Sequence, residues 1–535
     1  MTDDPSVVFT LRRCALLGAM LVGIAALRIV ATYTPLSHTM DEPIHLGAGM
    51  EWLDHGTMTG DVSHPPMARV LSAIGPWLAG ERWTPTGNTT TDGLAVLGRD
   101  GHYDRMLALA RLGVLPLFVI ASGMVFLWGN RAGGPLAGLV ATFLFTTVPP
   151  VLAHAGQVTT DMAATAFTAA GAYAGLVWAE RPDRRRTVAL GLAVGLGMIA
   201  KYSLLVFLPG VWVTMYLCHW RGMRAVPGQL RKYWRPAAAA AAIACVVIWA
   251  GFRFSFGPLS HFHVSLPAPR FFDGWHDIWL HNQEGHASYI LGRQHHFGVW
   301  YFFPVTLAVK TPLAMILLLA WSVWTAWRKR LRVAEPLAYC AVILAIAMSS
   351  RINLGVRHVL PIYVGLAVIG GVASAALLRQ ARGMAAGRWA GLGASLLFAL
   401  FGWQVFSGAL AHPDYLSYTN EITRGCPEAF VAESDLDWGQ DMHRVGNFLK
   451  KAGATEVAFT PYNVTYLEAG HVFPKVTYSN WYHASPGWNV VSLSGWKVYN
   501  HPGWIGQRQP EFRIGRTHWA WYFRAGEEAR YTEVK

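Results

Sequence analysis

The chain has 535 residues, of which 53% are hydrophobic and only 14% are charged, whereas an average soluble domain carries about 25% charged residues. The apolar residues gather in blocks of the length that a bilayer requires of a spanning helix, so the composition argues against a soluble protein and predicts a polytopic membrane protein. The net charge of +13 falls mostly in short loops between these blocks, and no basic domain or recognition motif accompanies it, so we expect no nucleic-acid partner.

The apolar blocks predict eleven transmembrane helices. They cover residues 14–34, 106–129, 133–152, 160–179, 187–200, 203–218, 236–255, 302–326, 334–349, 358–378 and 389–410. One set of connecting loops is short and basic, and the other is mostly longer and rich in His, Trp and Pro. By the positive-inside rule, the basic loops and the N-terminus are cytoplasmic. The fold class is therefore a mainly α membrane domain with about eleven spans, placed in a bacterial inner membrane.

The first outer loop, residues 35–105, contains the acidic pair Asp41 and Glu42 directly before a proline. Proline and acidic residues both favour a helix N-terminus, so we predict a helix after Asp41 and a second helix after the SHPP segment. Both helices should lie along the membrane interface, with His64 near Asp41. Local pattern alone leaves two interpretations open, a helix cap or a reaction centre. Because neighbouring helical residues point about 100° apart, at most one of the two acids should face a given site.

The apolar stretch 187–218 contains one lysine, Lys201. A single overlong helix would invert the orientation of every later loop, whereas two short helices that meet near Lys201 keep all basic loops inside. We therefore predict a break at Lys201, near the outer surface. A lysine in this position is costly unless it is paired or reaches the lipid headgroups, and both alternatives remain open.

Beyond residue 410 the composition changes, and segments such as EVAFTPYNV and GWNVVSLSGWKVY are typical of strands. We predict two domains, a transmembrane catalytic domain (1–410) and a small extracytoplasmic α/β domain (411–535).

Seven stretches occur in an order that is familiar from one class of enzymes. They are DEPIHLG (41–47), SHPPMARVLSA (63–73), PPVLAHAGQVTTDMAATAF (149–167), GLAVGLGMIAKYS (191–203), GHASYILGRQHHFGVWYFFPVTLAVKTP (285–312), SRINLGVRHVLPIY (350–363), and YLSYTNEITRG with ESDLDWGQD (415–441). On these segments the chain resembles the GT-C membrane glycosyltransferases. The most similar groups are the protein O-mannosyltransferase-like and lipid A aminoarabinose-transferase-like enzymes, including bacterial phospholipid-carrier-dependent glycosyltransferases.

The resemblance implies transfer of a sugar from a polyprenyl-phosphate donor to an acceptor hydroxyl of a protein, lipid or glycan on the outer membrane face. In such families an acid of the first outer loop is the catalytic base, which corresponds to Asp41 with Glu42 beside it, and a second important acid corresponds to Asp161. A phosphate leaving group needs no general acid, so a base and fixed positive charge suffice. Attack from the face opposite the phosphate would invert the anomeric centre.

Three residues at the outer ends of spans are candidates for binding the donor phosphate. They are Lys201, Arg357 and His358. Arginine suits bidentate phosphate contacts, although binding of a lipid headgroup is an open alternative for Arg357 and His358. We expect Asp41, Asp161 and Lys201 to line one outward-opening cavity.

The outer loop 256–301 is unusually rich in histidine and has no HExxH spacing. Glu284 and His286, in QEGH, resemble a stretch of the family, and together with His64 they are secondary candidates for binding substrate or metal. We assign no metal ligands and no certain cofactor, and leave a divalent cation open. In ESDLDWGQD the acids miss the spacing of an EF-hand calcium loop.

Two rival functions come from other classes. A secondary transporter would favour internal repeats and several charged sites on broken helices, but the sequence shows no repeat. A membrane assembly protein of envelope glycan synthesis that has lost catalysis is the second rival, and the retained Asp41 argues against it. The sequence leaves the sugar, whether hexose or pentose, and the acceptor undetermined.

Overall fold

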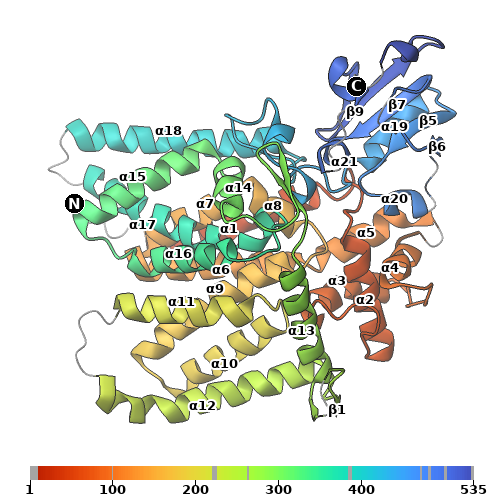
Figure 1. Ribbon diagram of the computed structural model, residues 1–535. Helices are drawn as coiled ribbons and strands as arrows, with labels where there is room; N and C mark the ends of the chain where they lie inside the picture. The colour runs from red at the N-terminus through yellow and green to blue at the C-terminus, as the bar shows by residue number, and fades with distance from the viewer. Residues whose placement is uncertain are drawn as a thin grey trace.

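The computed structural model describes residues 10–98, 101–219, 226–261, 264–382, 388–469, 471, 473–479, 483–498 and 503–531. Most of this chain forms a bundle of roughly parallel helices, and a β-sheet and a group of shorter helices lie together at one end of the bundle (Figure 1). The bundle helices are α1 (Leu11–Val30), α6 (Leu115–Gly133), α7 (Pro135–Thr146), α9 (Asp161–Glu180), α10 (Arg184–Met198), α11 (Leu204–His219), α12 (Val226–Gly251), α15 (Leu313–Lys329), α16 (Ala334–Met348), α17 (Ile362–Arg382) and α18 (Arg388–Ala411).

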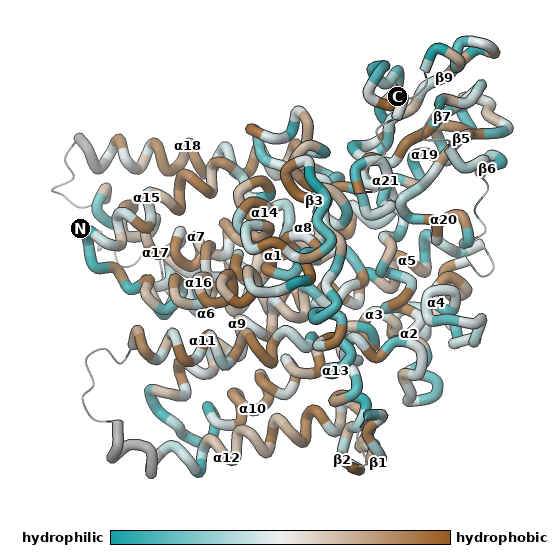
Figure 2. Tube along the Cα trace, in the orientation of Figure 1, coloured by the Kyte–Doolittle hydropathy of each residue, from teal (hydrophilic) through white to brown (hydrophobic). Residues whose placement is uncertain are grey.

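Apolar residues run along these helices, whereas the C-terminal part of the chain is mixed in hydropathy (Figure 2). Six helical stretches among the described residues are long and apolar enough to cross a membrane, and the number rises to eight if each of two bent pairs is one span. The chain is therefore a multi-pass membrane protein with several apolar helices, as predicted. The count of eleven spans and their orientation stay predictions.

The two bent pairs differ from the straight spans that the sequence predicts. The predicted span 302–326 is broken between α14 (Phe302–Lys310) and α15, at an angle of 112°. Predicting one helix here was wrong, because Pro312 has no N–H and disfavours helical backbone at the residue before it. The predicted span 133–152 likewise bends by 71° between α7 and α8 (Pro149–Ala155), at a pair of prolines.

The break that the sequence predicts near Lys201 is confirmed. Helix α10 ends at Met198 and α11 begins at Leu204, so Lys201 lies in the short connection between two helices. The side of the membrane on which this connection lies is still a prediction.

The two helices predicted in the first long loop are present. Helix α2 (Glu42–His55) starts directly after Asp41, and α3 (Pro66–Leu78) starts within SHPP. They are followed by α4 (Thr89–Gly98), which was not predicted, and by α5 (Tyr103–Leu112). Helices α2 and α4 cross so closely that a Cβ atom on Gly47 would overlap the carbonyl oxygen of Thr89. This contact requires glycine and holds the start of α2 rigidly.

A five-stranded mixed sheet forms the C-terminal end of the chain, with the strand order β6-β5-β7-β9-β8. Strand β5 pairs in parallel with β6 and β7, whereas β9 pairs antiparallel with β7 and β8. The strands are β5 (Glu456–Thr460), β6 (Lys475–Thr477), β7 (Gly487–Ser492), β8 (Phe512–Ile514) and β9 (His518–Phe523), and the nearby helices are α19 (Met442–Lys451), α20 (Thr465–Glu468) and α21 (Leu493–Val498). Two small hairpins lie earlier in the chain: β1 (Phe256–Pro258) with β2 (Ser265–Pro267), and β3 (Ser288–Ile290) with β4 (Arg293–His295), separated by α13 (Pro269–Glu284).

The segment between α18 and the sheet packs into the helical bundle. The buried Lys310 at the end of α14 donates hydrogen bonds to the carbonyl oxygens of Leu416 and Asp435, each at 2.6 Å. The side-chain amide of Asn420 donates to the carbonyl oxygens of Ala308 and Thr311, at 2.5 and 3.2 Å. Residues beyond the predicted domain boundary at 411 therefore share their core with the helices, and the division into two domains stays a prediction.

Candidate active site

Asp41 forms an ion pair with Arg357, which lies 316 residues away in sequence. One guanidinium nitrogen of Arg357, on the short 3-10 helix η2 (Val356–Val359), donates to Asp41 Oδ2 at 2.7 Å. The guanidinium also lies 4.3 Å from the centre of the Trp438 ring. Asp41 makes no capping hydrogen bond to α2, so its side chain does not serve as a helix cap. The Asp41 side chain remains 32% exposed.

Unlike Asp41, Glu42 is buried, with only 1% of its side chain exposed. Its two oxygens accept from Arg111 Nε and Nη2, each at 2.8 Å, and from the backbone N–H groups of Thr39 and Val158 at 2.7 and 3.0 Å. Burial alone would raise the pKa of Glu42, but the charge of Arg111 and these hydrogen bonds outweigh it and lower the pKa. This placement does not fit the prediction that Glu42 is catalytic, because its oxygens are committed to structural contacts.

A second ion pair joins Asp161, the first residue of α9, to Lys201 in the α10–α11 break. Lys201 Nζ lies 2.5 Å from Asp161 Oδ1, and the two side chains are 15% and 1% exposed. Of the alternatives for Lys201, the structure has the paired lysine. Oδ2 of Asp161 is buried without a hydrogen-bond partner among the described residues, so this carboxylate retains an unused acceptor.

His64 and His358 both lie within the electrostatic range of residues from the two ion pairs. Burial, together with the positive charges around them, holds the pKa of both His64 and His358 well below the usual value. For His64 those charges are Arg69, Lys201 and Arg357, and for His358 they are Lys201 and Arg357. Both imidazoles are therefore neutral at neutral pH, and any contact of His358 with a phosphate would be a hydrogen bond without a charge.

Arg357 connects the two pairs, because its charge acts on both Asp41 and Asp161. Burial alone would lower the pKa of Arg357, but these two carboxylates outweigh it and raise the pKa. The structure thus brings together Asp41, Asp161, Lys201, His64, Arg357 and His358. A common cavity lined by Asp41, Asp161 and Lys201 stays a prediction.

The QEGH segment divides between the two secondary candidates. His286 lies near His358, and its backbone N–H donates to the carbonyl oxygen of Arg351. Glu284 ends α13 as an exposed residue, and no hydrogen bond or ion pair joins it to the two ion pairs within the described part of the chain. Predicting Glu284 as a site residue therefore gains no support from its position.

The described residues of the histidine-rich loop form no metal centre. Across the described ranges, no group of three or more His, Cys, Asp or Glu side chains is arranged to hold a metal ion, and His263 lies outside those ranges. The question of a divalent cation stays open. Of the acids in ESDLDWGQD, Asp435 accepts from the backbone N–H of Val356 at 3.0 Å, and Asp437 accepts from Ser492 Oγ at 2.5 Å. These acids act as structural acceptors.

Several buried charged residues around the site escaped the sequence analysis. Arg69 donates to the carbonyl oxygen of Asp61 at 2.8 Å and to His45 Nδ1 at 3.3 Å. It also pairs with the carboxylate of Asp61 in the α2–α3 connection, and its contact with His45 joins α3 to α2. Arg69 lies within the SHPPMARVLSA segment, but no sequence signal distinguishes a buried arginine from a surface one. The same applies to Arg111.

Glu433 is a further buried acid beside Arg357. Its side chain accepts a hydrogen bond from the Tyr462 hydroxyl at 3.2 Å, and its backbone adopts a left-handed φ of 52°, which is uncommon for a residue other than glycine. Burial and the nearby carboxylates Asp435 and Asp41 raise its pKa to about 7, against the lowering effects of Tyr462 and Arg357.

Comparison with solved structures identifies the architecture. ArnT from Cupriavidus metallidurans in the apo state matches with a TM-score of 0.53 at 14% identity, over 94% of this chain and 97% of that chain. This chain has the GT-C fold. The same ArnT bound to undecaprenyl phosphate matches the GT-C chain with a TM-score of 0.52 at equal identity and coverage. The S. cerevisiae protein O-mannosyltransferase Pmt1-Pmt2 complex bound to the sugar donor gives 0.50 at 12% identity, over 75% of this chain and 90% of that chain.

A comparison with family models agrees with the structural matches over part of the chain. Residues 107–250 match the family model described as dolichyl-phosphate-mannose-protein mannosyltransferase. This range includes Asp161 and Lys201 but neither Asp41 nor Arg357. No match was found among curated protein sequences.

Proposed function

We propose that this protein is an inverting glycosyltransferase that moves a hexose or pentose from a polyprenyl-phosphate donor to an acceptor hydroxyl at the outer face of a bacterial inner membrane. One observation carries the proposal. In a GT-C fold, the partly exposed carboxylate of Asp41 is held by Arg357, and the charge of Arg357 also acts on Asp161 of the buried Asp161–Lys201 pair. The ArnT and Pmt1-Pmt2 structures, which hold undecaprenyl phosphate and a sugar donor respectively, support a lipid-phosphate donor.

Asp41 is the base in this mechanism. Its free oxygen accepts the proton of the acceptor hydroxyl as the acceptor oxygen attacks the anomeric carbon. The bond from that carbon to the phosphate oxygen breaks, and its electron pair leaves with the lipid phosphate. Attack opposite the phosphate inverts the anomeric centre. The ion pair with Arg357 fixes the direction of the Asp41 carboxylate.

Lys201 and Arg357 supply fixed positive charge for the departing phosphate. Lys201 uses one of its three N–H donors on Asp161, which leaves two for a phosphate oxygen. We assign Asp161 as a positioning residue that holds Lys201, and Glu42 as a structural residue that holds the start of α2. His64 and His358 are candidate neutral hydrogen-bonding groups for sugar or acceptor.

The test uses purified full-length wild type, Asp41→Asn, and the matched control Asp104→Asn, an exposed acid in the first turn of α5. Each protein is incubated with a panel of polyprenyl-phosphate monosaccharides and with membranes as the source of acceptors, and donor consumption is measured. Loss of one general base costs about 10²–10⁴-fold in rate, so Asp41→Asn should fall by that factor while Asp104→Asn keeps the wild-type rate.

Two results would count against the proposal. Full activity of Asp41→Asn at matched thermal stability would remove Asp41 as the base. A wild type that consumes no donor of the panel, but moves such a lipid or its sugar across proteoliposome membranes, would favour the transporter instead.

A further inference from the structure

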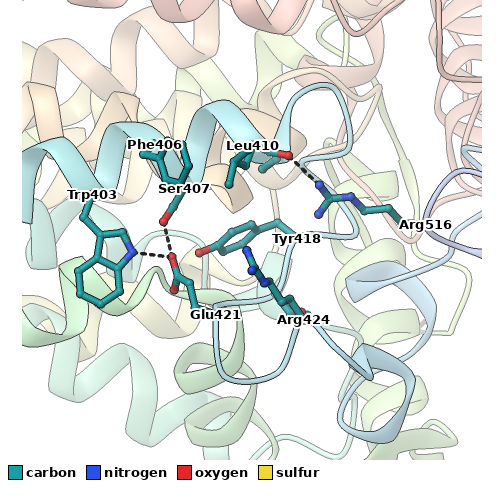
Figure 3. Close-up of a pocket in the computed structure, with 10 residues that line it drawn as sticks. Trp403, Phe406, Ser407, Leu410, Tyr418, Glu421, Arg424 and Arg516 are labelled. Atoms are coloured by element: carbon teal, nitrogen blue, oxygen red, sulfur yellow. Dashed lines mark hydrogen bonds between the residues drawn. The ribbon is translucent and has the colours of Figure 1, made fainter.

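A separate cavity lies at the C-terminal end of α18, between that helix and the segment that follows it (Figure 3). None of its lining residues belongs to the two ion pairs of the candidate active site. One wall consists of Trp403, Phe406 and Leu410 on α18. Arg424 and Arg516 also line the cavity, and Arg516 lies beside Leu410 at the end of α18. The cavity therefore combines an apolar wall with two cations.

The apolar wall continues along α18. This helix is apolar enough to span a membrane, and it presents a long series of large exposed apolar side chains, namely Leu392, Leu396, Phe398, Val405, Phe406 and Leu410. Phe406 and Leu410 belong both to this exposed face and to the cavity. A lipid chain that lies along α18 would thus bring its headgroup to the cavity.

The polar groups of the cavity have both signs of charge. Arg516 donates to the carbonyl oxygen of Leu410 at 2.7 Å, which places its guanidinium at the end of α18. Its Nε also lies 3.7 Å from Asp414 Oδ2, and the Arg516 side chain remains 38% exposed. Arg424 is exposed, and no ion pair is found for its side chain within the described ranges. Glu421 accepts from Trp403 Nε1 at 2.9 Å and from the Ser407 hydroxyl. Burial would raise the pKa of Glu421, but these hydrogen bonds lower it, so it is ionised at neutral pH.

We propose that this cavity binds the headgroup of a zwitterionic aminophospholipid, with the phosphate between Arg424 and Arg516 and the ammonium at Glu421. Arginine forms strong charge-assisted hydrogen bonds to phosphate oxygens. The carboxylate disfavours a purely anionic headgroup, and the exposed apolar face of α18 favours a lipid over a free phosphate. The Tyr418 ring also lines the cavity and lies between Arg424 and the Ser407–Glu421 pair (Figure 3). This site would be occupied whether or not the chain transfers sugars.

Native mass spectrometry of the purified full chain tests the proposal with two lipids of equal acyl length, phosphatidylethanolamine and phosphatidylglycerol. Wild type should retain phosphatidylethanolamine preferentially. Arg424→Gln should weaken this retention about tenfold, the effect of one lost charge-assisted hydrogen bond. The matched control is Arg293→Gln, an exposed arginine of β4 outside the cavity, which should behave as wild type. Glu421→Gln keeps an oxygen acceptor for Trp403 but removes the charge, so it should abolish the preference between the two lipids.

Four outcomes would overturn the proposal. The first is equal retention by wild type and Arg424→Gln, and the second is a wild-type preference for phosphatidylglycerol. The third is displacement of the lipid by glycerophosphoethanolamine or inorganic phosphate at concentrations near that of the lipid. That result would mean that the site binds the headgroup or the phosphate alone. The fourth is displacement by a polyprenyl phosphate at equal concentration, which would assign the cavity to the donor lipid.

Discussion

Asp41 and Glu42 are neighbours in sequence, but the structure predicts that replacing each acid by its amide affects a different property. Glu42→Gln should lower stability, and Asp41→Asn should lower activity. Glu42→Gln keeps the shape of the side chain but leaves the buried Arg111 guanidinium without a counter-charge. Removal of one partner from a buried ion pair costs about 3–5 kcal/mol. Asp41→Asn also affects a buried arginine, but Arg357 keeps the charge of Asp161, and the Asp41 carboxylate is 32% exposed, so we expect a smaller loss of about 1 kcal/mol.

These free energies translate into measurable shifts of the thermal midpoint. A chain of this size shifts by roughly 1–2 °C per kcal/mol, so Glu42→Gln should lower the midpoint by about 3–10 °C and Asp41→Asn by no more than about 2 °C. Thermal unfolding in detergent at pH 7, followed by tryptophan fluorescence, measures both. Donor consumption is then assayed well below all midpoints, where Glu42→Gln should keep most of its activity and Asp41→Asn should lose it.

A double-mutant cycle with Arg111→Met isolates the interaction energy between Glu42 and Arg111. If Glu42 and Arg111 act as one buried pair, Glu42→Gln with Arg111→Met should be less destabilised than the sum of the two single variants by at least about 2 kcal/mol. Additive losses would refute the ion-pair argument. Equal midpoints for Glu42→Gln and Asp41→Asn would refute the assignment of one acid to structure and the other to catalysis.

Three further predictions follow from buried charges. Because the pKa of Glu433 is raised to about 7, the folded chain holds a proton that the unfolded chain has released; stability should therefore fall by about 3 kcal/mol as pH rises from about 4.5 to 7, then level off. Glu433→Gln should remove this fall, and identical thermal midpoints of wild type and variant at both pH 5 and pH 7.5 would contradict it. Lys201→Met should cost about 3–5 kcal/mol by leaving Asp161 unpaired; adding Asp161→Asn should restore part of the stability but no donor consumption, and a double variant as unstable as the sum of the singles would count against the pair. Lys310→Met leaves two buried carbonyl oxygens without a donor and should cost about 2–5 kcal/mol in unfolding free energy, so near-wild-type stability would show that its contacts to the 412–441 segment contribute little.

The spacing of apolar residues, the prolines and the loop charges were enough to predict the local elements around the site. The proline after Glu42 and the SHPP segment correctly indicated the starts of α2 and α3, and the charge of the flanking loops correctly indicated the break at Lys201. The same signals failed for 302–326, because average hydropathy does not register that Pro312 redirects the chain.

The ion-pair partners could not be predicted in this way. Asp41 and Arg357 are 316 residues apart, and Glu42 and Arg111 are 69 residues apart. A hydropathy or helix pattern reports the environment of a segment, and the pairing of two side chains depends on how distant helices cross. For the same reason the sequence left Arg69 and Glu433 unmarked, since their burial is a property of the packed bundle and of the segment that covers it.

The sequence by itself determined the class of the molecule, because hydrophobic length and loop charge act locally and the resemblance to GT-C enzymes is carried by short contiguous segments. It placed Asp41, Asp161 and Lys201 among the candidates but left open which acid of the DE pair faces outward. Only the tertiary structure decided that question. Arg111 and two backbone N–H groups enclose Glu42 inside the protein, whereas the single contact with Arg357 leaves Asp41 accessible.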